Sequence, residues 1–567
     1  MMFGQLPSTV DELLKWKWED IEAHYRELEA RPLSKQNVSQ WLKDWSDLGR
    51  HLYEMYNRWY VATTTNTADQ QAEEGFKSFL EEIFPNAQNK ENNLKKKLLE
   101  SGLQPDGFEV ALRNIKADAE LFREANLPLI TEEQKLDIEY DKIMGAQTVQ
   151  WDGEERTVPE MYIVQLENDR GRRERAFRLM LERQYADYES INELWIKFMA
   201  LRRQMAANAG RPNYRDYMWQ QKLRFDYTPK DAKAFHDAIE EVIVPATARM
   251  RERRRKRLGI ESVRPWDTDV DAFGTEPIRP FKTIDELMRG ARLIFDKVHP
   301  DLGNYFQRMA DEGLLDLDSR KNKTPGAYCT SFDAARLPFV FCNSVGTHDD
   351  VATLLHESGH AFHVFETADI ELFQNLNVTM EFGEVASTGM ELLAAPFLTD
   401  SGMYTEKEAA RARISHLESM LTLWPYVAVV DGFQHWVYEN HDTASDPIKC
   451  NEKWAELYDR YMVNIDWTGI EKYKAMRWQR QSHIIQVPFY FIEYGLAQLG
   501  AVQVWANSLH DYDGAVQAYR KALSLGGTVS TPELFKAANT KFAFDPATLK
   551  QSVDLVEQTL EELESKL

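Results

Sequence analysis

An apolar stripe at helical spacing runs through residues 41–59, and it restricts this segment to one kind of structure. Its members follow one another at intervals of three or four residues: Trp41, Trp45, Leu48, Leu52, Met55 and Trp59. Because an α-helix completes a turn in 3.6 residues, this spacing gathers the side chains on one face. The stripe therefore predicts an amphipathic helix with a buried aromatic face. Similar patterns recur along almost the whole chain, so the sequence predicts a mainly α-helical protein.

Two polar segments stand out from this pattern. Residues 86–93 (NAQNKENN) lack apolar side chains except one alanine, and they predict a connection between helices. Residues 249–259 (RMRERRRKRLG) form a basic cluster of the kind that can bind nucleic acid. Cations before a glycine also suit the C-terminus of a helix, where they complement its dipole. We interpret this cluster as a solvent-exposed helix end.

Strand signals are concentrated between residues 325 and 345. The segments GAYCTSF (326–332) and LPFVFCNS (337–344) are rich in aromatic and β-branched residues, and a polar stretch separates them. Pro338 fits the start of a strand or a sheet edge. The sequence therefore predicts a small hairpin here, and an exposed edge of it could accept an extended peptide as an added strand.

Charge and composition exclude several classes of protein. The net charge of −23 disfavours nucleic acid or an anionic membrane surface as the main partner, because both are negatively charged. No stretch approaches the roughly 18 apolar residues of a membrane span, and the N-terminus lacks a signal-peptide pattern. The cysteines, none in a CxxC pair, suggest neither a disulfide framework nor a thiolate zinc site: Cys329, Cys342 and Cys450. We expect a protein of the cytoplasm.

The segment LHESGHAFH (355–363) carries the clearest chemical signal. The predicted helix begins after Thr347 or Asp349, either of which can cap it, and no proline interrupts it. His356 and His360 then lie one turn apart on one face, which is the geometry that two imidazoles need to bind one Zn²⁺. Glu357 lies close enough to act on a water at such a metal.

A catalytic zinc site usually has three protein ligands, so a further donor is expected downstream. The segment TMEFGEVASTGMELLAAPF (379–397) offers two candidates on a second predicted helix, Glu381 and Glu384. Both can return to face the first helix, and spacing alone does not separate them.

Several motifs together resemble one known family. LLHESGHAFH followed by FGEVASTGMELL is similar to the oligoendopeptidase F branch of the thimet oligopeptidase family of zinc metallopeptidases. QSHIIQVPFYFIEYGLAQLG resembles the histidine-and-tyrosine segment of that family, and GAYC with PFVFCNSVGTHDDVATLLHE resembles its substrate-edge hairpin. The helical middle region is particularly similar to the Pz-peptidase-like members. The similarity is strong in the C-terminal half and weaker before about residue 170.

The resemblance implies roles for individual residues. The glutamate of the EVAST segment is the third zinc ligand in that family, which makes it Glu384 here. By the same resemblance, His483, Tyr490 and Tyr494 line the site opposite the metal and stabilise the oxyanion. The spacing between this histidine and the tyrosines differs in distant relatives, so the choice of Tyr490 or Tyr494 as the main donor stays open.

Two more side chains lie close to these motifs in the sequence. His363 follows His360 on a similar helix face, and we assign it to the surroundings of the metal or to a substrate subsite. Glu391 lies two turns after Glu384 and can orient a ligand histidine.

The resemblance also implies an architecture. Members are large, two-lobed, mainly α proteins with a small β-sheet next to the active-site helix and a deep substrate channel. On this basis we expect an N-terminal helical lobe (1–190), a helical middle region that bridges the lobes (191–324) and a zinc-binding catalytic region (325–567).

The resulting hypothesis is a zinc endopeptidase with one Zn²⁺ per chain that hydrolyses short, unstructured oligopeptides. Glu357 acts as general base toward the metal-activated water. One alternative is a helical zinc carboxypeptidase or dipeptidyl carboxypeptidase, which would share the ligands and differ in how it captures the substrate carboxylate. Another is a non-catalytic peptide-binding protein, which would have no need of Glu357 beside a metal.

Overall fold

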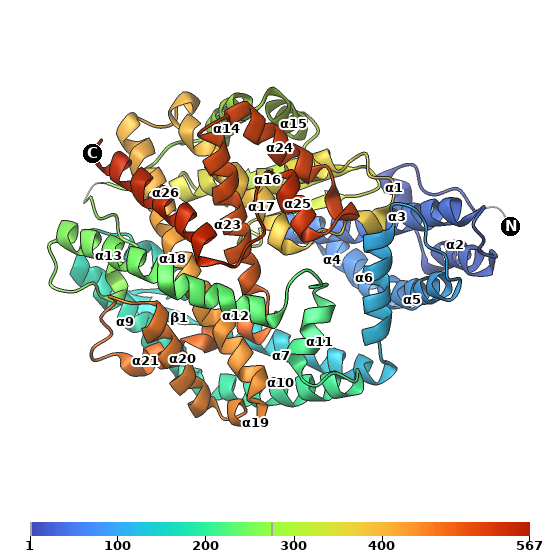
Figure 1. Cartoon of the computed structure of the whole chain (residues 1–567), viewed down its shortest axis with the longest axis horizontal. Coiled ribbons are helices and arrows are strands. Elements are labelled where there is room, and N and C mark those ends of the chain that lie inside the picture. Colours follow the sequence, from blue (N-terminus) through green and yellow to red (C-terminus); the bar gives the residue numbers. More distant parts are fainter. Residues whose placement is uncertain (1–2, 274–275) are drawn as a thin grey trace. The chain divides into compact units, whose positions relative to one another are not determined.

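Helices form most of the structure, as the sequence predicts, and two small sheets accompany them (Figure 1). The computed structural model describes residues 3–273 and 276–567. The chain divides into two compact units, each assembled from three separate segments. Unit 1 comprises 1–120, 278–409 and 497–542, and unit 2 comprises 121–277, 410–496 and 543–567. The expected division into three consecutive regions (1–190, 191–324 and 325–567) stays a prediction, as does the substrate channel.

The elements of unit 1 are the following: α1 (Val10–Leu13), α2 (Trp18–Ala30), α3 (Val38–Thr65), α4 (Gln70–Ser78), α5 (Phe84–Glu100), α6 (Glu109–Leu121), α14 (Ile284–Val298), α15 (Pro300–Asp311), β3 (Leu315–Asp318), β4 (Tyr328–Phe332), β5 (Leu337–Ser344), α16 (His348–Glu366), α17 (Met380–Ala394), α24 (Tyr512–Leu523) and α25 (Thr531–Ala537). Two further helices begin in one unit and end in the other: α18 (Glu406–Glu439) and α23 (Phe491–Ser508).

The elements of unit 2 are the following: α7 (Leu127–Gly145), β1 (Thr148–Trp151), β2 (Glu154–Thr157), α8 (Val158–Gln165), α9 (Arg170–Ala186), α10 (Tyr188–Asn208), α11 (Tyr214–Gln221), α12 (Pro229–Ala238), α13 (Val244–Leu258), α19 (His441–Ala444), α20 (Pro447–Tyr461), α21 (Glu471–Ala475), α22 (Ser482–Ile485) and α26 (Pro546–Glu564). Among the described residues, no helix combines the length and the apolar composition that a membrane span requires.

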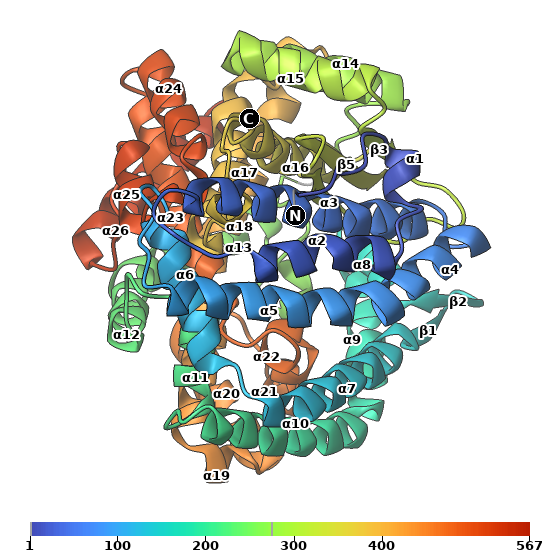
Figure 2. The same cartoon turned by 90° about the vertical axis from the view of Figure 1, so that its right-hand side faces the viewer.

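The aromatic stripe lies on α3, as predicted. Trp41 and Trp45 are almost completely buried, and Trp59 packs against the same core while partly exposed. α2 and α5 lie beside α3 and contribute to this core (Figure 2). The prediction of a connection at residues 86–93 is wrong, because this segment lies inside α5. Its polar side chains are tolerated there because buried leucines at 94 and 98 hold the same helix to the core.

The predicted hairpin is confirmed as β4 and β5, which pair antiparallel. The sequence did not reveal β3, which joins the other side of β5 in parallel, so that the sheet order is β3-β5-β4 and β4 is an edge strand. The β1–β2 hairpin of unit 2 was also missed. Its turn carries Asp152-Gly153, both with positive φ, which is a sequence signal for a two-residue hairpin turn.

The prediction of a helix end at residues 249–259 is confirmed, because α13 ends at Leu258 and Gly259 is its left-handed C-cap. The prediction that its cations are solvated is wrong for several of them. Arg251 and Arg254 on α13 are buried, and Arg254 forms an ion pair of 2.9 Å with Glu418. Arg249 pairs with Glu557 of α26, and Arg257 pairs with Glu564 of the same helix. These cations therefore hold α13 to its neighbours within unit 2.

α16 packs against both the sheet and α17 in unit 1 (Figure 2). The two helices approach so closely at Gly359 that a Cβ atom there would lie 2.5 Å from the carbonyl oxygen of Ala386. It would also lie 2.7 Å from the Cα atom of Ser387. Both distances are shorter than van der Waals contact, and the neighbouring atoms are backbone. Glycine at position 359 is therefore required for this helix pair.

We predict that Gly359→Ala destabilises the protein by about 1–3 kcal/mol, because the added methyl must push two helix backbones apart. Thermal unfolding of the purified protein measures this effect. Ser358→Ala is the matched control on the same helix: Ser358 is fully buried and its hydroxyl has no hydrogen-bond partner. That control should leave the unfolding midpoint unchanged or raise it. Equal midpoints for wild type and Gly359→Ala would contradict the close-contact argument.

Candidate functional site

α16 begins where the sequence placed it and presents two histidines on one face. Thr347 is its N-cap, and Thr347 and Asp350 form a reciprocal capping box, which resolves the choice between Thr347 and Asp349. His356 and His360 follow one turn apart, with ring centroids 5.2 Å from each other. The cap sets the start of the helix, and the helix sets the direction of both rings.

Glu384 on α17 completes a group of three possible metal ligands. Its Oε2 atom lies 3.5 Å from Nε2 of His356 and 3.6 Å from Nε2 of His360. One ligand atom from each residue lies within 4.8 Å of the other two. No other group of possible metal ligands is found among the described residues, and Glu381 is not a member of this one. The structure therefore brings together Glu384, and not Glu381, with the two histidines.

The geometry of this group fits a zinc ion. Tetrahedral zinc with nitrogen and oxygen ligands at about 2.0–2.2 Å places its ligand atoms roughly 3.3–3.6 Å apart. The two histidine-to-glutamate distances are close to that spacing. Two imidazoles and one carboxylate also form a donor set that catalytic zinc sites use. Little movement of the side chains would be needed to bind the ion.

A further set of contacts holds the three side chains in place. Glu391 accepts a hydrogen bond of 2.7 Å from Nδ1 of His356, as the sequence suggested it could. Ser387 donates a hydrogen bond of 2.9 Å to Oε2 of Glu384. Burial lowers the pKa of His356, but hydrogen bonds to Glu384 and Glu391 outweigh it and raise this pKa to about 10. The two carboxylates thus favour positive charge at the site.

Glu357 is buried next to this group. Burial raises the pKa of its carboxyl to about 7, and the charge of His356 opposes that shift. The backbone of Cys329, on edge strand β4, forms a hydrogen bond to this carboxyl. The structure therefore places this carboxyl group close to both the candidate ligand His356 and strand β4.

His363 lies further along α16, and its surroundings differ from those of His360. Burial lowers the pKa of both imidazoles to about 4. A backbone hydrogen bond with Leu523, at the end of α24, holds His363, whereas its Nε2 atom is buried without a partner. His363 is not in the group of possible ligands.

His483, Tyr490 and Tyr494 come together in unit 2. The ring of His483 lies 5.6 Å from that of Tyr490 and 5.7 Å from that of Tyr494, measured between centroids. The Tyr494 hydroxyl is 3.5 Å from Nε2 of His483. Burial, followed by the charge of Lys222, lowers the pKa of His483 to about 4. At neutral pH this imidazole is therefore uncharged.

The backbone before Tyr490 adopts an unusual conformation. Phe489 is fully buried and has φ of 65°, in the left-handed region that non-glycine residues rarely adopt. Its N–H donates to the side-chain oxygen of Gln434, and its carbonyl accepts a hydrogen bond from Arg224. Arg224 also forms an ion pair of 2.6 Å with Glu493. Sequence reasoning missed these buried contacts, which hold the turn that carries Tyr490.

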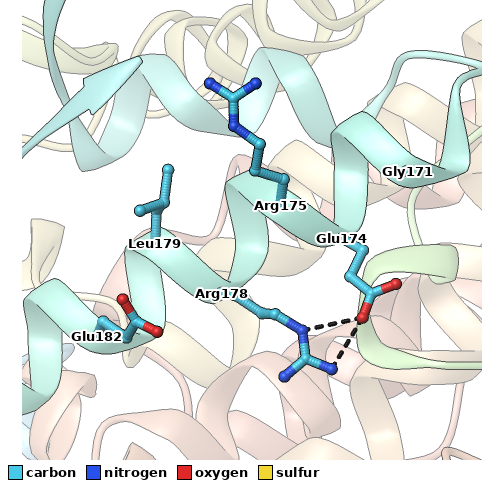
Figure 3. Close-up of a pocket in the computed structure, with 6 residues that line it drawn as sticks. All are labelled: Gly171, Glu174, Arg175, Arg178, Leu179 and Glu182. Atoms are coloured by element: carbon cyan, nitrogen blue, oxygen red, sulfur yellow. Dashed lines mark hydrogen bonds and ion pairs between the residues drawn. The ribbon is translucent and has the colours of Figure 1, made fainter. Parts of the chain in front are cut away.

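A surface depression on α9 contains none of the candidate residues. It has a volume of about 370 Å³ and is lined by residues between 171 and 182 (Figure 3). Arg178 bonds to Glu174 one turn away, and Arg175 points away from this pair (Figure 3). The depression lacks the convergent polar groups of a catalytic site.

Two family descriptions match this chain. The profile of Peptidase family M3 matches residues 163–553, and that of the Peptidase M3 N-terminal domain matches residues 13–121. Together they include every candidate residue of the site. These matches confirm the resemblance that the sequence motifs suggested.

Individual proteins show the same similarity. An oligoendopeptidase F homologue of Mycoplasma genitalium is 23% identical over 57% of this chain and 52% of its own length. Oligopeptidase PepF of Bacillus subtilis is 23% identical over 47% of this chain and 40% of its own. The chain thus spans about half, or less, of these relatives. The structure of Pz peptidase A with an inhibitor is 26% identical, with a TM-score of 0.86 over 97% of this chain and 99% of the other.

We predict that the protein binds one zinc ion per chain and that Glu384→Gln weakens this binding more than Glu391→Gln does. Glu391 is hydrogen-bonded to a ligand histidine and is not itself in the group of possible ligands, and loss of such a contact typically weakens metal binding about 10- to 100-fold. Titration against a chromogenic chelator measures both affinities. Glu381→Gln is the matched control, with another buried glutamate of α17, and it should bind zinc like wild type. A large loss in that control would assign the third ligand to Glu381 instead.

Proposed function

This chain belongs to peptidase family M3, and we propose that it is a zinc-dependent endopeptidase that hydrolyses internal bonds of short, unstructured oligopeptides. The observation that carries the proposal is the position of Glu357: a buried carboxyl beside three side chains suited to bind zinc. The similarity to oligopeptidases and to Pz peptidase A supports the substrate class. We place the protein in the cytoplasm, with oligopeptides and not nucleic acid or membranes as its partners.

The proposed mechanism assigns a step to each residue of unit 1. His356, His360 and Glu384 would hold the zinc ion, which when bound lowers the pKa of a water molecule and polarises the substrate carbonyl. Glu357 accepts a proton from the attacking water and returns it to the departing amine. A carboxyl group in this position can serve both halves of this transfer, because it can take up a proton and release it again. Glu391 and Ser387 keep the ligand side chains oriented.

We assign the developing oxyanion to His483 and the two tyrosines. When water attacks a peptide carbonyl, negative charge forms on the oxygen, and N–H or O–H donors aimed at it lower the barrier. An uncharged imidazole and two phenols in one cluster offer such donors. We include their action on the substrate carbonyl in the proposal.

The edge strand suggests how the peptide is held. Among the described residues β4 pairs with β5 alone, and the backbone of Cys329 on β4 forms a hydrogen bond to Glu357. An extended peptide added to this edge would run past Glu357, held by its main chain with little regard for its side chains. This supports hydrolysis of peptides of varied sequence.

We predict that wild type cuts internal bonds in a ladder of unstructured peptides of a few to about thirty residues, whereas Glu357→Gln loses at least about 100-fold in rate. The substitution removes the base but keeps the size of the side chain. Mass spectrometry of the products locates each cut, and a zinc assay shows that the variant still holds its metal. Cuts only near C-terminal ends would favour a carboxypeptidase or dipeptidyl carboxypeptidase. Zinc binding without any cleavage by wild type would favour a peptide-binding protein.

We predict that Tyr490→Phe or Tyr494→Phe, whichever removes the main oxyanion donor, lowers kcat by about 100-fold. KM should change little, because the donor acts on charge that forms only in the transition state. Steady-state kinetics on one peptide identify the donor. Equal, small effects of both substitutions would transfer the role to His483.

A further inference from the structure

A chain of hydrogen bonds in unit 2 ends on His483. The side-chain nitrogen of Gln481 lies 2.7 Å from Nδ1 of His483. The Tyr426 hydroxyl donates a hydrogen bond of 3.0 Å to the side-chain oxygen of the same glutamine. Gln481 thus links Tyr426 to Nδ1 of the imidazole, whereas Tyr494 lies near the other ring nitrogen, Nε2.

The direction of these bonds decides where His483 carries its proton. An amide nitrogen can only donate, so Nδ1 must accept with its lone pair. A neutral imidazole has one N–H, and it must then be on Nε2. Nε2 is the atom that lies 3.5 Å from the Tyr494 hydroxyl. The N–H therefore points toward the tyrosine side of the cluster.

Tyr426 is held so that it can orient the glutamine. Its ring packs edge-on against Phe491, at 5.5 Å between centroids, and against Trp454, at 6.3 Å. Phe491 in turn packs against His483, at 5.1 Å. With the tyrosine ring fixed by these contacts, its hydroxyl anchors the oxygen end of the Gln481 side chain, and the amide nitrogen lies on the side of the histidine.

Tyr426 follows an unusual residue in α18. Pro425 lies inside the helix and lacks the N–H that would bond to the carbonyl of Leu421. The hydroxyl of Thr247 lies 3.2 Å from that carbonyl oxygen and also 2.9 Å from the carbonyl of Ile243. The Thr247 hydroxyl can thus replace the missing N–H as hydrogen-bond donor to the Leu421 carbonyl, one turn before Tyr426.

We propose that Tyr426 and Gln481 are positioning residues that hold His483 as the Nε2–H tautomer, so that its N–H is available to the substrate oxyanion. The inference rests on the proposed function for its catalytic meaning, but the tautomer itself is a property of unit 2 and can be measured without turnover. Neither residue touches substrate in this scheme. They act through the imidazole, in the way that a buried partner sets the tautomer of other catalytic histidines.

Nitrogen-15 NMR of the full-length protein with labelled histidine tests the tautomer. The His483 signals are identified by their absence from the spectrum of His483→Gln. At pH 7.5 we expect Nε2 in the protonated range and Nδ1 in the unprotonated range. A proton on Nδ1 of the wild-type protein would overturn the proposal.

Two substitutions test the cause. Gln481→Glu offers a carboxylate that accepts a hydrogen bond, so Nδ1 should gain a proton. Gln481→Met offers no partner, and the two tautomers should mix. Gln486→Met is the matched control, because Gln486 bonds to Asp141 and not to His483; it should leave the His483 signals unchanged. Unchanged signals in both Gln481 variants would overturn the proposal.

Kinetics connect the tautomer to catalysis. We expect Gln481→Met to lower kcat for a peptide, by up to the roughly 100-fold that loss of one oxyanion donor costs, with KM nearly unchanged. A tautomer change with full kcat would overturn the catalytic part of the proposal. If wild type hydrolyses no peptide, the proposed function fails while the NMR result still decides the tautomer. Unfolding midpoints within the range of wild type exclude a general loss of structure.

Discussion

The close contact between α16 and α17 at Gly359 is the constraint on which the candidate metal centre depends. Two ligands come from one helix and the third from the other, so the separation of the helices sets the distance between them. A Cβ atom at position 359 would collide with backbone of α17 at Ala386 and Ser387. Ser387 also donates to Glu384, so the residue at the contact orients the ligand. The glycine within HESGH, Gly359, is thus required for the close packing of α16 against α17.

Several charged side chains are buried among the described residues, and pairing with opposite charges holds many of them in place. Around the candidate metal centre, Glu384 and Glu391 both lie beside His356, and their negative charges favour a cation there. In unit 2 the same rule governs a basic cluster. Arg254 is buried against Glu418, and the outer arginines of α13 reach carboxylates of α26. A chain with a net charge of −23 therefore uses many of its cations for internal packing.

Because the chain belongs to peptidase family M3, we interpret these local arrangements as parts of a peptidase site. In the proposed mechanism Glu357 is the base beside the metal ligands, and the cluster of His483 with the two tyrosines provides hydrogen-bond donors for the oxyanion. Those donors depend on buried polar contacts. Phe489 keeps its left-handed conformation through Gln434 and Arg224, and His483 keeps its proton position through Gln481. Such contacts hold the donor groups in position before a substrate binds.

Periodicity and motif spacing by themselves determined the helical class, the hairpin before the HESGH helix, and the pair of histidines one turn apart. These features are local, since a helix or a hairpin brings together residues that are near in sequence. The sequence did not predict the short strands. β3, for example, has only four residues, and it is a strand because it pairs with β5. Residues 86–93 were misjudged because burial of neighbouring leucines outweighed their polarity. Spacing left Glu384 and Glu381 open, the family resemblance implied Glu384, and the tertiary structure places Glu384 beside the two histidines. Only tertiary structure turned arginines of α13 inward and joined Gln481 to Tyr426, because both depend on which elements pack together.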